Sequence, residues 1–138
     1  LRAHQGQVWA IEKKEDAVEL IHRNKAKFAA DNLEIVEGLA PEALKDLPTP
    51  THAFIGGSSG NLKEIVKLLV EKNPQVRIVI NCITLETVSE ALETAKEFGF
   101  EENEIVQLGA ARSKAIGRYH MMMGENPIYI ITLQNHGK

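Results

Sequence analysis

Short apolar runs rich in Val and Ile alternate along this 138-residue chain with amphipathic stretches long enough to form helices. This alternation is typical of strands and helices that build a mostly parallel sheet. The pattern predicts strands at 8–11, 33–36, 53–55 and 77–81, and helices at 15–30, 41–47, 62–71 and 84–98. The sequence therefore predicts one domain of the α/β class, covering residues 1–138.

The last third of the chain follows a different pattern. Apolar runs at 104–108 and 128–133 are separated by the basic segment 111–120, and no helix-length stretch lies between them. Two strands joined without a crossover helix are usually antiparallel neighbours. We therefore expect the sheet to end in an antiparallel C-terminal strand.

Composition excludes several classes of function. The formal charge of -3 and the pI near 6.0 provide no general attraction for nucleic acid or for an anionic membrane. No stretch approaches the roughly 20 apolar residues that a membrane span needs. We therefore predict no nucleic-acid partner and no membrane partner.

Cysteine and histidine usage argues against a metal site and against an oxidising compartment. Cys82 is the only cysteine, so no internal disulfide can form and no CxxC zinc motif exists. The five histidines, at 4, 22, 52, 120 and 136, show no HxH or HxxxH spacing. We predict a cytoplasmic protein without a bound metal, in which Cys82 is a small buried side chain.

Ligands of open parallel sheets collect at the carboxyl ends of the strands. The residues that follow the predicted strands are Glu12, Gly38, Gly56-Gly57 and Asn81-Cys82. A carboxylate closing an early strand can accept hydrogen bonds from both hydroxyls of a ribose, which is one interpretation of Glu12. The other interpretation is an ordinary solvated carboxylate at a strand end.

Glycines at the end of the third strand suggest close approach of a ligand to the backbone. The run Gly56-Gly57-Ser58-Ser59-Gly60 precedes a helix, where free amide groups can hold an anion. It matches neither GxGxxG nor the phosphate-loop pattern GxxxxGK[ST]. An ordinary tight turn, with Ser59 or Asn61 capping the helix, is the alternative.

The basic segment contains Arg112, Lys114 and Arg118 with no acidic residue between 112 and 120. Arginine side chains suit carboxylates, so a ligand with several carboxylates is a chemical candidate. A solvated hairpin loop is the alternative. The three methionines at 121–123 are interpreted as packing residues.

Five stretches together resemble a known family: VWAIE, LEIVEGLAPEAL, HAFIGGSSGNLKEIV, RIVINCITLETVSEAL and ENPIYIITL. The sequence is similar to the decarboxylating precorrin methyltransferases of cobalamin biosynthesis over nearly all of its length. The resemblance implies a three-layer, Rossmann-like class I methyltransferase fold that uses S-adenosylmethionine. It also implies methylation of a precorrin, a tetrapyrrole, at carbon 15, with decarboxylation of the acetate at carbon 12, by a homotetramer.

The resemblance assigns site residues by position. Glu12 matches the residue that holds the cofactor ribose, Gly38, Leu39 and Ala40 the loop beside the adenine, and Ile55, Gly56 and Gly57 the strand end near the methionine. Arg112, Arg118, Tyr119 and His120 match the segment near the tetrapyrrole. No catalytic residue is assigned, because methyl transfer from a sulfonium depends on positioning and requires no dedicated nucleophile.

One departure from the family pattern concerns the beginning of the chain. Class I methyltransferases have a first strand and a glycine-rich loop that nothing before Val8 supplies. That strand would lie between the strands at 8–11 and 53–55, so we expect a preceding segment in the natural protein.

Two other functions remain open from sequence alone. One is a class I methyltransferase that acts on another small molecule, on RNA or on protein. The other is a non-catalytic nucleotide-binding or oligomerisation module, which the absent glycine loop favours.

Overall fold

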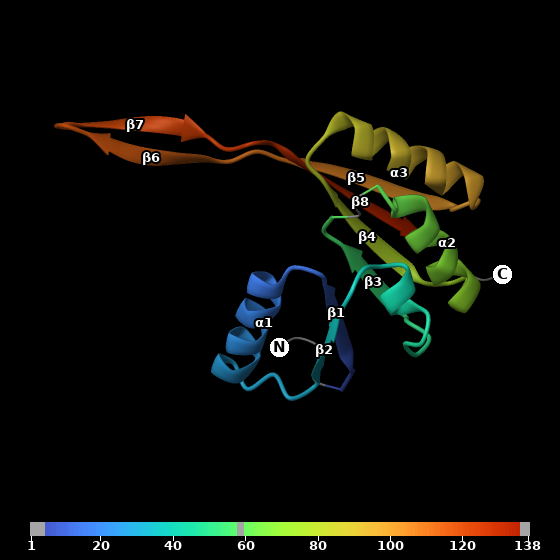
Figure 1. Cartoon of the computed structure of the whole chain (residues 1–138). Coiled ribbons are helices and arrows are strands. Elements are labelled where there is room, and N and C mark those ends of the chain that lie inside the picture. The colour runs from blue at the N-terminus through green and yellow to red at the C-terminus, as the bar shows by residue number, and fades with distance from the viewer. Residues whose placement is uncertain (1–4, 58–59, 136–138) are drawn as a thin grey trace. The chain divides into compact units, whose positions relative to one another are not determined.

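The computed structural model describes residues 5–57 and 60–135 (Figure 1). The chain divides into two compact units, Leu1–Pro48 and Thr49–Lys138. Its strands form three separate sheets, one in the first unit and two in the second. No helix in the described part of the chain is long and apolar enough to span a bilayer.

The first unit is a strand–helix–strand motif. Strand β1 (Val8–Glu12) pairs in parallel with β2 (Leu33–Glu37), and helix α1 (Glu15–Lys27) connects them. Val18 of α1 is buried. The sequence predicted both strands and the start of the helix correctly.

Two predicted elements of this unit are shorter than expected. Helix α1 ends at Lys27 instead of residue 30, because Phe28 is its C-cap and Ala29 has a positive φ of 48°. The helix predicted at 41–47 is a single 3-10 turn, η1 (Glu42–Leu44).

The second unit contains a four-stranded sheet in the order β3-β4-β8-β5. Its strands are β3 (His52–Ile55), β4 (Arg77–Cys82), β5 (Glu102–Leu108) and β8 (Ile128–Gln134). Strand β8 is antiparallel to both β4 and β5, while β3 and β4 are parallel. The predicted antiparallel pairing of the last two apolar runs is therefore confirmed.

One face of this sheet is covered by helices α2 (Leu62–Lys72) and α3 (Leu85–Glu97), as Figure 1 shows. Side chains alternate along the strands, so every second residue of β4 and β8 points into this interface. The fully buried strand side chains there are those of Ile78, Ile80, Cys82, Ile131 and Leu133. The unit therefore has one hydrophobic core, between the sheet and the two helices.

Both ends of α3 carry local signals in the sequence that fix where the helix begins and ends. The Thr84 hydroxyl accepts a hydrogen bond of 3.1 Å from the backbone N–H of Thr87, as an N-cap does. Gly99 follows the helix with a φ of 66°, a conformation that glycine adopts without strain.

The segment predicted as a connection is a β-hairpin of its own. Strands β6 (Ala111–Ile116) and β7 (Tyr119–Gly124) pair in antiparallel fashion, and Gly117 lies in the turn with a φ of 58°. Every residue of both strands is exposed. The interpretation of the three methionines as packing residues is wrong within this chain, because they are 53%, 63% and 46% exposed.

The pairing of β8 with β5 predicts different stability losses for two isoleucines that lie opposite each other in this ladder. Ile131 is fully buried, whereas its partner Ile105 on the edge strand β5 is 48% exposed. We expect Ile131→Ala to lower the free energy of unfolding by about 2 to 5 kcal/mol, as for other buried large-to-small changes. Ile105→Ala is the matched control and should cost much less in the same chemical denaturation experiment. Equal losses in the two variants would contradict the described core.

Candidate cofactor-binding site

The carboxyl ends of β1 and β2 bring Glu12 and Gly38 together. Glu12 is the register partner of Glu37, and the backbone N–H of Gly38 donates a 2.9 Å hydrogen bond to the carbonyl oxygen of Glu12. Two of the residues assigned to the cofactor from sequence are therefore neighbours at one sheet edge.

The Glu12 side chain is held in place by the start of the turn that follows it. Its Oε1 accepts hydrogen bonds from the backbone N–H groups of Lys13 (2.8 Å) and Lys14 (2.9 Å). Within the described residues, Oε2 accepts no hydrogen bond. A fixed carboxylate with one free oxygen can accept from the hydroxyl groups of a ligand.

The backbone at Gly38, directly after β2, passes close to the 3-10 turn η1. Gly38 has a φ of 156°, and a Cβ at this position would lie 3.1 Å from the Cβ of Ala43. A larger residue would push the loop Gly38-Leu39-Ala40 away from η1. Leu39 is 42% exposed, so this loop presents an apolar side chain to its surroundings.

The other assigned cofactor residues lie at the carboxyl end of β3, in the second unit. Ile55 is buried in the core, while Gly56 and Gly57 are exposed. A Cβ on Gly57 would meet nothing within 4 Å, so the backbone there is open to a ligand. Ser58 and Ser59 lie outside the described residues, and so does the predicted cap by Ser59.

Asn61, the other predicted cap, occupies the N-cap position of α2, but its side chain forms no capping hydrogen bond. That alternative interpretation of the glycine-rich run is therefore wrong for Asn61.

Cys82 ends β4 and is fully buried on the helix-covered face. Burial raises the pKa of its thiol, and the nearby carboxylate of Glu90 raises it further. The thiol therefore stays protonated at neutral pH, which fits a structural role.

The four residues assigned to the tetrapyrrole do not converge. In the hairpin register, Arg112 and Tyr119 lie on one face, whereas His120 lies on the other. Arg112 Nε is 3.0 Å from Glu125 Oε1, and the Arg118 guanidinium lies 5.1 Å from the centre of the Tyr119 ring. The sequence did not predict this ion pair, because residues 112–120 include no acidic side chain and Glu125 lies just beyond them.

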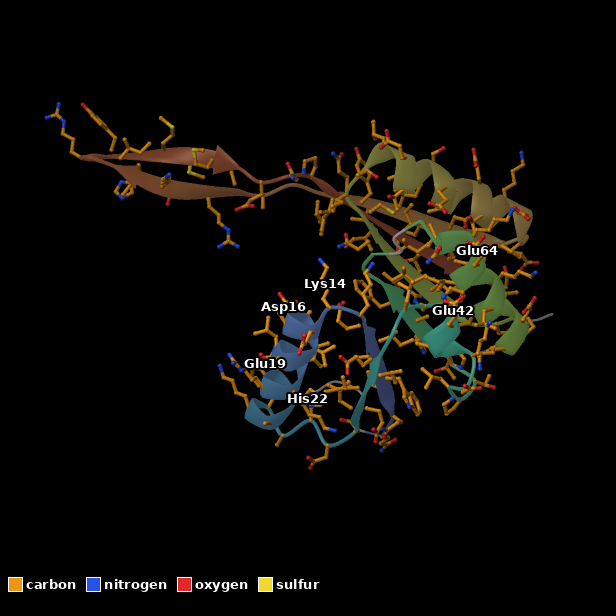
Figure 2. All side chains as sticks on the ribbon, viewed as in Figure 1. Lys14, Asp16, Glu19, His22, Glu42 and Glu64 are labelled. Atoms are coloured by element: carbon orange, nitrogen blue, oxygen red, sulfur yellow. The ribbon has the colours of Figure 1, made fainter. Side chains whose placement is uncertain are left out.

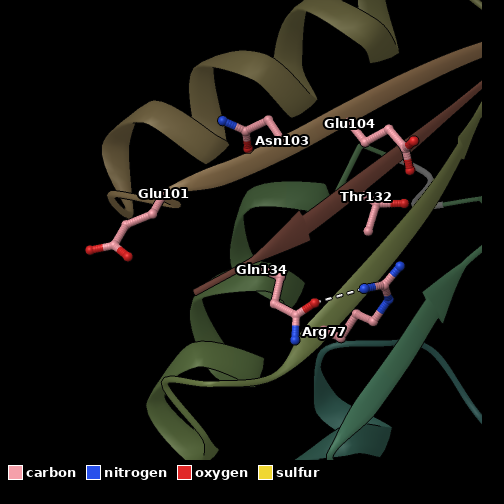
Figure 3. Close-up of a pocket in the computed structure, with 6 residues that line it drawn as sticks. All are labelled: Arg77, Glu101, Asn103, Glu104, Thr132 and Gln134. Carbon is pink, nitrogen blue, oxygen red and sulfur yellow. Dashed lines mark hydrogen bonds between the residues drawn. The ribbon is translucent and has the colours of Figure 1, made fainter. Parts of the chain in front are cut away.

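A polar depression of about 520 Å³ lies elsewhere in the second unit (Figure 3). Arg77 Nη1 donates a 2.7 Å hydrogen bond to Gln134 Oε1 within it. The remaining lining residues are Glu101, Asn103, Glu104 and Thr132. Because Arg77 begins β4, the depression lies toward the amino end of that strand, away from its carboxyl end, and no residue assigned from sequence lines it.

The described histidines do not form a metal site. His22 lies exposed on α1 beside Glu19 (Figure 2), and His52 and His120 are exposed on separate elements. His4 and His136 lie outside the described residues. Between residues 5 and 135, leaving out 58 and 59, no three His, Cys, Asp or Glu side chains are grouped as metal ligands.

Solved structures with the same architecture define the class of this domain. It matches the crystal structure of a precorrin-6Y C5,15-methyltransferase from Geobacter metallireducens with a TM-score of 0.84 and 37% identity, covering 94% of this chain and 69% of that one. It also matches a precorrin-8W decarboxylase from Methanobacterium thermoautotrophicum with a TM-score of 0.83 and 36% identity, covering 94% and 70% of the two chains. The domain therefore has the Rossmann-like methyltransferase fold, as the sequence predicted.

Sequence comparison then identifies the family. Residues 1–135 match the model of the precorrin methyltransferase domain, and the chain belongs to that family. A probable cobalt-precorrin-6B C(15)-methyltransferase (decarboxylating) from Pyrobaculum calidifontis is 40% identical over 126 residues, which are 91% of this chain and 64% of that protein. The chain thus spans slightly less than two thirds of that relative.

Proposed function

We propose that this domain methylates a precorrin at carbon 15 and promotes decarboxylation of its carbon-12 acetate, with S-adenosylmethionine as methyl donor. The single observation that carries the proposal is the fixed Glu12 carboxylate beside Gly38 in a chain of the precorrin methyltransferase family. The names of relatives at 36–40% identity support the substrate class.

The described residues suit the parts of this cofactor. Glu12 Oε2 is available for the ribose hydroxyls, and the exposed, apolar Leu39 side chain of the loop after Gly38 suits a flat adenine. Ala40 completes this loop, and Ile55, Gly56 and Gly57 would face the methionine part. The bound cofactor supplies an electrophilic methyl group on a sulfonium. The residues of the chain contribute by binding and orientation, which can supply much of the rate enhancement when two reactants must meet.

The substrate residues are proposed to act as an exposed basic surface along the hairpin, with Arg112 near its base and Arg118, Tyr119 and His120 at its turn. Arg112, Arg118, Tyr119 and His120 are all exposed, and none is confined by the core. A precorrin carries several carboxylates, and arginine binds carboxylates with directed hydrogen bonds. The ion pair of Arg112 with Glu125 is exposed, so exchange for a substrate carboxylate would cost little.

We further propose that the domain acts as a homo-oligomer, with a tetramer favoured, in the cytoplasm. The hairpin supports this proposal. An isolated two-stranded hairpin is at best marginally stable in water, and this one exposes the apolar side chains of Ile116 and the methionines 121–123. Association with further copies would cover these side chains and pair the open strand edges.

The proposed ribose contact predicts that Glu12→Ala weakens binding of S-adenosylhomocysteine. Each lost charge-assisted hydrogen bond should cost about 1.5 to 3 kcal/mol, which isothermal titration calorimetry can measure. Glu34→Ala, which removes an exposed carboxylate from the middle of β2, is the matched control and should bind normally. Unchanged affinity for Glu12→Ala would remove Glu12 from the site.

The proposed substrate contacts predict a different effect for the hairpin arginines. The double variant Arg112→Gln/Arg118→Gln should raise the Michaelis constant for the precorrin about tenfold or more, and should leave S-adenosylhomocysteine affinity unchanged. Arg23→Gln is the control, because Arg23 is also exposed and ion-paired, with Glu19 on α1. A normal Michaelis constant in the double variant would refute the assignment.

If the hairpin mediates oligomerisation, charged side chains introduced into the hairpin should lower the mass of the particle in solution. Met121 and Met122 lie on opposite faces of β7, so Met121→Glu/Met122→Glu puts one carboxylate on each face. Size-exclusion chromatography with light scattering should show smaller particles than for the unaltered protein. Leu20→Glu/Leu85→Glu, which changes two exposed leucines outside the hairpin, should keep the original mass. A hairpin variant of unchanged mass would argue against this interface.

A further inference from the structure

Asn81 near the end of β4 carries an unsatisfied polar atom. Its side-chain Oδ1 is buried and has no hydrogen-bond partner, and no other buried side-chain nitrogen or oxygen within residues 5–57 and 60–135 is in this state. Native proteins pair nearly all such atoms, because a buried acceptor without a donor loses its hydration and gains nothing in return. The atom therefore calls for a donor that the described chain does not supply.

Two neighbours of Asn81 on its own face of the sheet are apolar. It lies opposite Ile130 of β8, and Val79 precedes it on the same face. Its neighbours Ile80 and Cys82 point the other way, into the helix-covered core. The amide oxygen thus lies in an environment where a hydrogen bond to an incoming donor is strengthened by exclusion of water.

The chain beyond the neighbouring strand β3 has open space at Gly57, although the Phe54 ring lies close to Gly56. The last pair of the β3–β4 ladder is Ile55 with Ile80, and Gly56 and Asn81 each follow that pair by one residue. A Cβ on Gly56 would meet only the Phe54 ring, at 3.1 Å, and one on Gly57 would meet nothing within 4 Å. Asn81 therefore borders the stretch of bare backbone at which ligands of parallel sheets bind.

We propose that Asn81 is a ligand-binding residue whose Oδ1 accepts a hydrogen bond from an N–H or O–H group of the small molecule that binds over Gly56 and Gly57. This inference rests on the proposed function and adds to it a contact outside the assigned residues. Two molecules could supply the donor: the methyl donor, through its amino group or a hydroxyl, and the tetrapyrrole, through a ring N–H.

The test compares Asn81→Leu with the unaltered protein. Leucine is close to asparagine in size but accepts no hydrogen bond. Calorimetry would measure the affinity for S-adenosylhomocysteine and for its analogue without the α-amino group, and steady-state kinetics the Michaelis constant for the precorrin. Thr132→Val is the matched control, because it removes a polar group from the same face of the sheet toward the other end of β4. The melting temperature of each ligand-free variant completes the set.

If the methyl donor supplies the hydrogen bond, Asn81→Leu should weaken S-adenosylhomocysteine about tenfold. Unchanged affinity for the analogue would assign the donor to the amino group, whereas equal weakening would assign another donor of the same molecule. If the tetrapyrrole supplies it, the Michaelis constant should instead rise about tenfold. In each case the ligand-free melting temperature should stay the same or rise, since an unsatisfied atom has been removed.

Two results would overturn the inference. Unchanged affinities and an unchanged Michaelis constant would mean that Oδ1 meets only water. A fall of several degrees in the ligand-free melting temperature, absent from Thr132→Val, would make the amide a structural group. Failure of the proposed function is distinguishable, because the unaltered protein would then bind no S-adenosylhomocysteine.

Discussion

The double pairing of β8 is the interaction on which the larger unit depends. This strand bonds to β4 on one side and to β5 on the other, running against both. Its Ile131 and Leu133 are fully buried, so the hydrogen-bond ladders and the hydrophobic core are fixed by the same residues. Because β4 is held by β8, the end of β4 is held as well, and that end carries Asn81, one residue after the last pair with β3.

Both units place their candidate residues by the same rule. In the first, the parallel ladder of β1 with β2 sets Glu12 beside Gly38. In the second, Gly56 and Asn81 each come directly after the last pair of the parallel β3–β4 ladder, Ile55 with Ile80. The carboxyl ends of parallel strands suit ligand binding, because backbone groups there no longer pair within the ladder. Glycines at these ends also let a ligand approach the backbone closely.

The alternation of apolar runs predicted strands β1 to β4 and the long helices. A strand in a sheet and a helix packed against a sheet both bury apolar side chains at regular intervals, which is visible in the sequence. The two strands of the hairpin were missed for the same reason. Strands β6 and β7 bury neither face within the chain, so Arg112, Lys114 and the methionines show no inside–outside pattern. Glu12 and the glycines could be proposed from sequence because they follow apolar runs directly. The unpaired state of Asn81 depends on packing in three dimensions, which no local pattern encodes.

The buried thiol of Cys82 can report on opening of the core of the larger unit. A lone thiol beneath two helices, with its pKa raised by burial, reacts with an electrophile only after the sheet and helices separate. Its rate of labelling therefore reports how often the core of the larger unit opens. No labelling site needs to be engineered into the chain. All thiol labelling comes from Cys82, because the sequence contains no second cysteine.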